Sequence, residues 1–125
     1  LKKERPDITF VHLTIPLKPR PSSIKDHIRR LIGKPVWEDT LNQKRAVYNK
    51  LLLETFKDEP IFDIAHIESV NPDGSREVFF NGDKPYYALS TAYVSKGGHL
   101  NDTGQRLVAS KLVDFLAKVL SEKKQ

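Results

Sequence analysis

The sequence predicts a single α/β domain whose parallel sheet is covered by helices. Ile8–Leu17 is an apolar run rich in β-branched residues, which is typical of a strand buried on both faces, and Ile61–Ile67 is a second, shorter apolar run. A helical segment lies between the two runs, and a strand, a helix and a second strand in this order indicate a parallel crossover connection. The 125 residues suffice for one small domain and not for two.

The distribution of charge argues against a nucleic-acid module, and the length of the apolar runs argues against a membrane span. Lys and Arg number 21 against 16 for Asp and Glu, a net charge of +5. The cations are spread in small clusters and do not form one basic face with interleaved aromatic residues, so we interpret them as a solvated surface. No apolar run is long enough to span a bilayer.

Residue types that are absent or scarce limit the chemistry further. The chain has no Cys, which excludes disulfides, thiolate metal sites and a Cys nucleophile within these residues. None of the four His pairs with another His or Cys at metal-ligand spacing, so we expect no metal and no cofactor. Because the chain starts at Leu1 and has no Met, we expect a fragment or processed product. The location is left open, with an exported or periplasmic one slightly favoured over a cytoplasmic one.

Two helices are predicted between the strands. Ser23 is the expected N-cap of the first helix and Gly33 its end. Thr40 and Gln43 form a capping box that begins the second helix, which runs to about Phe56. We expect the inward stripe of this helix to hold Val47, Leu51 and Phe56, widened by Tyr48 and Leu52, and its solvent side to hold Lys44, Arg45, Asn49 and Lys50.

A β-hairpin is predicted after the second strand. Glu77–Phe80 and Pro85–Leu89 flank the turn sequence Asn81-Gly82-Asp83. Its aromatic side chains, Tyr86 and Tyr87 among them, either cover a site and shape substrate choice or pack on the body of the domain. Both interpretations stay open. For Trp37, packing over the short first helix is favoured over stacking on a sugar.

The stretch Tyr93–Ala109, YVSKGGHLNDTGQRLVA, combines a glycine loop with a helix start. Asp102 is the expected N-cap, and Gln105 closes a capping box. The apolar face of the helix is predicted to contain Leu107, Val108, Leu112, Phe115, Leu116 and Val119. The loop therefore presents His99 about one turn before a packed helix, and a general base has to be held rigidly in this way.

The segment GGHLNDTGQRLVA resembles the last conserved block of the SGNH, or GDSL-type, serine hydrolases. In that family a D-x-x-H motif supplies the acid and the base of a Ser-His-Asp triad. His99 matches the base, and Leu100, Asn101, Gly104 and Ala109 match the usual continuation. The resemblance extends from ITFVHLTIPL onwards. It implies a three-layer α/β/α flavodoxin-like fold with a parallel sheet, in which residues 1–125 are the C-terminal part of a single domain with an inserted β-hairpin.

Two features depart from the family pattern. Lys96 occupies the position of the acid, and a cation there would lower the basicity of the imidazole. The chain also contains no nucleophile or oxyanion motif, so the resemblance implies a serine upstream of these residues. Asp63 and Asp102 are possible substitute acids, although a structural role is favoured for Asp63 in a buried strand and capping competes at Asp102.

The predicted function is hydrolysis of ester bonds, in a carboxylic ester or an acetylated carbohydrate, with His99 as general base. The alternative is an inactive relative that binds a glycan or another ligand. Because ligands bind beyond the carboxyl ends of parallel strands, Thr14 and Pro16 are candidate cleft residues together with Tyr86 and Tyr87, although a plain strand exit explains the first two equally well. The open sheet edge is expected to be covered by the missing N-terminal half or by a second copy.

Overall fold

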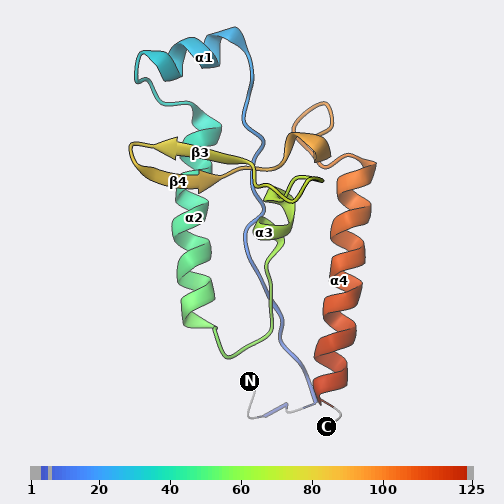
Figure 1. Cartoon of the computed structure of the whole chain (residues 1–125). Helices are drawn as coiled ribbons and strands as arrows, with labels where there is room; N and C mark the ends of the chain where they lie inside the picture. Colours follow the sequence, from blue (N-terminus) through green and yellow to red (C-terminus); the bar gives the residue numbers. More distant parts are fainter. Residues whose placement is uncertain (1–3, 6, 124–125) are drawn as a thin grey trace.

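The structure, a computed structural model, describes residues 4–5 and 7–123 and has a mixed α/β architecture (Figure 1). Its elements in chain order are β1 (His12–Leu13), α1 (Ile24–Leu31), α2 (Trp37–Thr55), β2 (Ile61–Phe62), α3 (Ile64–Ser69), β3 (Val78–Asn81), β4 (Lys84–Tyr87), the 3₁₀ helix η1 (Thr91–Tyr93) and α4 (Asp102–Lys123). The long helices α2 and α4 lie on opposite sides of the central chain segments. The general α/β class is therefore confirmed.

The first sheet pairs β1 with β2 in parallel, with His12 opposite Ile61 and Leu13 opposite Phe62. The ladder continues through a hydrogen bond from Thr14 N–H to Phe62 O at 3.3 Å. Parallel pairing across a helical crossover confirms the predicted topology. The longer strand predicted here, buried on both faces, is wrong: only two residues pair, and Leu13 is 51% exposed.

The second apolar run forms a strand and then a helix, because an aspartate stops the strand. The Asp63 carboxylate accepts hydrogen bonds from His66 N–H at 3.1 Å and from the Thr14 hydroxyl at 2.9 Å. It is thereby the N-cap of α3, one residue after β2 ends. The prediction of a single strand over Ile61–Ile67 is wrong, since a short apolar run fits a strand and a buried helical turn equally well.

The short helix α1 begins and ends as predicted. The Ser23 hydroxyl accepts a hydrogen bond from Asp26 N–H at 3.2 Å. At the other end Gly33 has a φ of +70°, and Lys34 N–H donates to Arg29 O at 2.8 Å. This pairing closes a Schellman motif, which needs a residue without a side chain at the left-handed position. Both ends of α1 are thus fixed by local sequence.

Helix α2 begins a turn earlier than predicted, at Trp37. Val36 is the N-cap residue and provides no side-chain hydrogen bond. The Thr40 hydroxyl donates to Val36 O at 3.1 Å from inside the first turn, so the capping box predicted with Gln43 is wrong. The helix ends at Thr55, close to the predicted end.

The buried side of α2 is polar, which reverses the predicted orientation. Its buried residues are Asp39, Asn42, Asn49 and Leu52. Val47 and Leu51, predicted to face inward, are 63% and 61% exposed. Asn49, predicted to face solvent, is buried. Of the predicted apolar stripe, Leu52 is buried, and Phe56 is partly buried and stacks on His12 with ring centroids 4.0 Å apart. On the predicted solvent side, Lys44 and Lys50 are exposed as expected.

Two asparagines on α2 explain this reversal. The Asn42 side chain accepts from Lys18 N–H and donates to Lys18 O, both at 2.8 Å. Seven residues on, Asn49 makes the same pair of bonds to the backbone of Ile15, at 2.7 and 3.0 Å. A carboxamide carries both a donor and an acceptor, so each asparagine forms hydrogen bonds with both the N–H and the C=O group of one residue. Side chains of α2 therefore hold the chain leaving β1, which makes one further backbone pairing, from Leu89 N–H to Lys18 O at 3.1 Å.

The predicted hairpin is confirmed as the antiparallel pair β3–β4. The turn contains Gly82, with a φ of +60°, and Asp83 between the paired residues Asn81 and Lys84. The hairpin packs on α2 (Figure 1). Phe79 is 4% exposed, and the Asn81 amide donates to Gln43 on α2 at 3.1 Å. The hairpin therefore packs on the body of the domain, and its role in covering a site stays a prediction.

The apolar core lies between α3, the segment after β4 and the start of α4. It consists of Leu17, Ala65, Leu89 and Tyr93, with Tyr87, Val94, Leu100 and Leu107 packed against it. Farther along α4, the Phe115 ring lies 5.5 Å from that of Phe62 on β2. The predicted inward face of α4 is thus largely confirmed. Leu116, at 38% exposed, lies at its border.

Candidate functional site

The loop that carries His99 is closed by backbone hydrogen bonds. Val94 and Leu100 form an antiparallel bridge at its base. Across the loop, Ser95 N–H donates to His99 O at 2.7 Å. The turn between them needs two left-handed residues, supplied by Gly97 (φ +92°) and Gly98 (φ +78°). The sequence thus builds a tight, defined loop.

The start of α4 braces this loop, through a different residue from the one predicted. The Asn101 side chain accepts from Gly104 N–H at 2.9 Å, so Asn101 and not Asp102 is the N-cap. The Gln105 side chain donates to Leu100 O at 3.0 Å, so the predicted capping box is also wrong. Asp102 becomes the first helical residue, and its exposed carboxylate is not engaged in capping.

Close packing places the loop beyond the carboxyl end of β1. A side chain at Gly98 would lie 3.4 Å from Pro19 Cγ, so the loop backbone lies against the segment that follows β1. A side chain at Gly104 would come within 2.8 Å of Tyr93, so α4 and η1 are in direct contact. In open α/β sheets the carboxyl ends of the strands are where ligands bind.

His99 is accessible and unpaired among the described residues. Its imidazole is exposed and makes no hydrogen bond or ion pair within that part of the chain. Lys96, at the family's acid position, is exposed on the same loop. Neither Asp63 nor Asp102 forms an ion pair with the imidazole. The described residues therefore contain an accessible imidazole without a carboxylate partner.

Thr14 and Asp63 meet at the carboxyl ends of β1 and β2. Besides donating to Asp63, the Thr14 hydroxyl accepts from Ala65 N–H at 3.0 Å, and Thr14 is 1% exposed. Pro16 is exposed, and its carbonyl accepts a hydrogen bond from Arg45. The Thr14–Asp63 pair therefore joins the two strands to α3, and the Thr14 side chain is closed off from solvent.

An apolar groove of about 860 Å³ lies between α2 and the hairpin. Tyr86, Tyr87 and Asp63 line it, and the outward residues Val47 and Leu51 lie on its α2 side. His99 is not among its lining residues. The structure thus brings three predicted site residues to one groove and leaves the predicted base in a separate place.

Cationic side chains lie on the aromatic wall of this groove. The Arg76 guanidinium lies 3.4 Å from the Tyr87 ring centroid, and the Lys84 ammonium 5.5 Å from that of Tyr86. Arg76 also donates to the Ser69 hydroxyl, which fixes its position. Cation–π contact of this kind holds a positive charge against an apolar surface.

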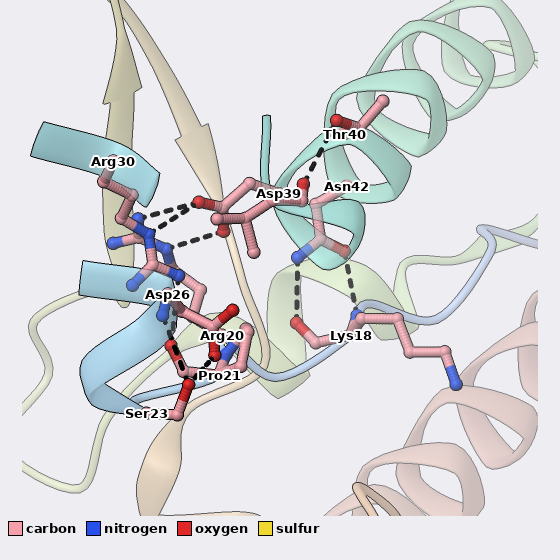
Figure 2. A network of polar contacts seen from close by, with 10 residues as sticks. Lys18, Arg20, Pro21, Ser23, Asp26, Arg30, Asp39, Thr40 and Asn42 are labelled. Carbon is pink, nitrogen blue, oxygen red and sulfur yellow. Dashed lines mark hydrogen bonds and ion pairs between the residues drawn. The ribbon is translucent and has the colours of Figure 1, made fainter. Parts of the chain in front are cut away.

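A charge cluster holds α1 against α2 (Figure 2). Asp39 is buried, and its two carboxylate oxygens accept from Arg20 Nε at 2.9 Å and Arg30 Nε at 3.0 Å. Burial alone would raise the pKa of Asp39, but the hydrogen bonds and charges of the two arginines outweigh it, and the pKa is lowered. Asp39 therefore stays ionised.

Glu68 on α3 is the opposite case. Burial raises its pKa, and the hydrogen bond from Leu17 N–H at 3.0 Å and the charge of Arg45 oppose this only in part. Sequence analysis missed both Glu68 and the asparagine pair. A signal for the asparagines existed in their spacing of seven residues, which puts them on one helix face.

Comparisons with known proteins add no relative: no family model, no curated protein and no solved structure matches this chain. Within the described residues, no three His, Asp or Glu side chains are grouped so that they could hold a metal ion. None of the helices in that part of the chain combines the length and apolar character needed to cross a membrane.

Proposed function

We propose that this chain is the base-bearing, C-terminal part of an SGNH-type serine hydrolase that acts on a carboxylic ester or an acetylated carbohydrate. Its complete domain would have the three-layer α/β/α flavodoxin-like fold. The observation that carries the proposal is an accessible imidazole on a braced glycine loop beside the carboxyl end of β1. The GGHLNDTGQRLVA block supplies the assignment to this family.

The proposed chemistry needs three groups. A serine, expected in polypeptide preceding Leu1, attacks the ester carbonyl while His99 accepts the hydroxyl proton. The resulting imidazolium gives this proton to the departing alcohol, and an acyl-enzyme remains. Water, activated by the same imidazole, then releases the acid. The exposed position of His99 allows a serine from outside residues 7–123 to reach the ring.

The acid of the triad is the least defined group. Asp63 is held by Thr14 and by the N-terminus of α3, which favours a structural role. Asp102 is exposed and close to His99 in sequence, and because Asn101 caps the helix, its carboxylate is available. We therefore favour Asp102 as the substitute acid. The exposed position of Lys96 lets its ammonium point to solvent.

Ester turnover tests this proposal. The protein, expressed with the polypeptide that naturally precedes Leu1, is assayed with p-nitrophenyl acetate. His99→Ala should reduce kcat/KM at least about 10³-fold, as the loss of a triad base does. His27→Ala removes an exposed histidine on α1 and should leave turnover unchanged. Equal turnover by wild-type protein and His99→Ala would overturn the assignment.

A second candidate function is ligand binding without catalysis, in the groove beside the hairpin. Two observations favour it: the described residues offer His99 no acid partner, and Tyr86 and Tyr87 form an aromatic wall of the kind on which a sugar ring stacks. This candidate predicts no turnover by the wild-type protein. It also predicts that Tyr86→Ala weakens binding of acetylated oligosaccharides, whereas His99→Ala does not.

A further inference from the structure

The segment 22–37, which we call the α1 arm, carries large apolar side chains that point to solvent. They are exposed by between 51% and 85%: Ile24, Ile28, Leu31, Ile32 and Trp37. At 100° per residue, the four aliphatic positions fall within an arc of about 100°, the width of a complete apolar helix face. In Figure 1 α1 lies at one end of the molecule, beyond the hairpin and well away from α4.

The outward direction of this face is fixed by the opposite side of the helix. Arg30 projects toward the body, where it binds Asp39 and donates to Pro21 O at 3.1 Å (Figure 2). Asp26 is hydrogen-bonded to the Ser23 hydroxyl at the helix start. Turning the apolar face inward would break the ion pair of a buried carboxylate, which is strongly unfavourable. The arm is therefore built with its apolar side outward.

The charges beside the apolar face are cationic. Lys25, Arg29 and Lys34 are exposed, whereas the charge of Arg30 is compensated by Asp39. Asp26 is the single acidic residue of the α1 arm. An apolar face with cations at its border and a Trp at its end matches an anionic bilayer surface, where apolar groups enter the headgroup region and cations meet phosphate.

We propose that the α1 arm docks the protein on an anionic lipid surface, with α1 lying in the plane of the interface. This inference is independent of the proposed hydrolase activity. A second copy of the chain is the competing occupant, but two arms packed face to face would bring Lys25, Arg29 and Lys34 close to their own counterparts. Like charges at such a contact oppose association.

The test uses vesicles and the intrinsic fluorescence of Trp37, the single Trp of the sequence. Vesicles of equal parts phosphatidylglycerol and phosphatidylcholine should shift its emission to shorter wavelength and sediment the protein. Affinity for pure phosphatidylcholine vesicles should be lower by about 100-fold, because several cations lose their phosphate partners. Raising the salt concentration should weaken binding to the anionic vesicles.

Matched variants separate the apolar face from a general charge effect. I28E/L31E should weaken binding at least about tenfold. V113E/L120E makes the same charge change at exposed apolar positions of α4 and should bind as the wild type does. All four positions are exposed, and circular dichroism verifies that both variants fold.

Three results would overturn the inference. The first is an unchanged Trp37 spectrum with anionic vesicles, and the second is equal binding by I28E/L31E and V113E/L120E. The third is an emission shift that depends on protein concentration alone, which would assign the apolar face to a second copy of the chain.

Discussion

Helices α2 and α4 are the two long helices in the described part of the chain, and they bury opposite kinds of side chain. In α4 the apolar residues face the core, and Val119 is buried while Val113 on the other side is 64% exposed. In α2 the polar residues Asn42 and Asn49 are buried, while Val47 is 63% exposed. Both helices have apolar positions at helical spacing, yet only in α4 does this spacing predict the inward face.

The difference lies in what each helix packs against. Helix α4 meets side chains, such as Phe62 and Tyr93, and buries apolar surface against them. Helix α2 meets bare backbone, the segment from Ile15 to Lys18 that has left the sheet. Backbone amides and carbonyls need hydrogen-bond partners when buried, and an apolar helix face cannot supply them. A polar inward face is therefore the stable arrangement in α2.

The largest effect expected from this comparison is at Asn42. Asn42→Ala removes both hydrogen bonds to Lys18 and leaves the Lys18 amide unpaired, while Lys18 O keeps its bond from Leu89 N–H, so the free energy of unfolding should fall by about 3 kcal/mol. Val47→Ala, on the exposed apolar side, should change it by less than about 0.5 kcal/mol. Urea unfolding measures both, and the reverse ranking would show that α2 faces the other way.

The corresponding substitution in α4, at Phe115, should lower the free energy of unfolding somewhat less than Asn42→Ala does. Phe115→Ala removes a half-buried ring that contacts Phe62, so a loss of about 2 kcal/mol is expected. Val113 lies two residues before Phe115, on the exposed side of the helix. Val113→Ala is therefore the matched control and should change the free energy of unfolding very little. Thermal unfolding of the two variants compares them directly. A larger loss for Val113→Ala would mean that α4 is buried on its other face.

A smaller effect concerns the loop that α4 braces, and it depends on the proposed function. Lys96→Asp places a carboxylate three residues before His99, where the SGNH pattern has its acid. This should raise kcat/KM for p-nitrophenyl acetate at least about tenfold, because a carboxylate stabilises the imidazolium. Lys96→Ser removes the cation without adding an acid and should give a smaller gain. A loss of turnover in Lys96→Asp would show that position 96 does not serve His99.

The smallest effects concern how the free energy of unfolding depends on pH. The carboxyl groups of Asp39 in α2 and Glu68 in α3 contribute to this dependence with opposite signs. The pKa of Asp39 is lowered from 3.8, so the stability that it contributes is complete above that pH and is lost as pH falls through the folded-state pKa. The pKa of Glu68 is raised from 4.5, so stability falls as pH rises from there through its folded-state pKa.

The free energy of unfolding, measured against pH, checks both directions. Asp39→Asn should remove the loss at low pH, and Glu68→Gln should remove the decline at higher pH while its side-chain oxygen still accepts from Leu17. If Glu68→Gln leaves the higher-pH decline in place, the buried carboxyl is not its cause.

Cap and turn residues in the sequence correctly predicted the features that depend on only a few neighbouring residues. Ser23, Gly33 and the Gly82 turn fix their own backbone and appear as expected. The parallel pairing of β1 and β2 also follows from the order of elements. By contrast, Asp102 and Asn101 are adjacent cap-forming residues, and only the packing against η1 decides that Asn101 caps α4. The faces of α1 and α2 depend on long-range partners such as Asp39 and Lys18, which local periodicity does not contain.

In the proposed site, too, the local features could be predicted from the sequence and the long-range ones could not. The glycine loop and the helix behind it are local, so His99 could be singled out from the sequence. The groove could not, because its walls come from α2, α3 and the hairpin, and the outward position of Leu51 follows only from the asparagine contacts. Tyr86 and Tyr87 lie in that groove and not beside the predicted base.

The most direct test of the central claim is the rate at which a fluorophosphonate probe labels the protein expressed with its naturally preceding sequence. The account predicts covalent labelling of one serine, at a rate that falls on the order of 100-fold in His99→Gln. Mass spectrometry would locate this serine before Leu1. Absence of labelling, or a rate that is the same in His99→Gln, would contradict the claim that His99 activates a serine nucleophile.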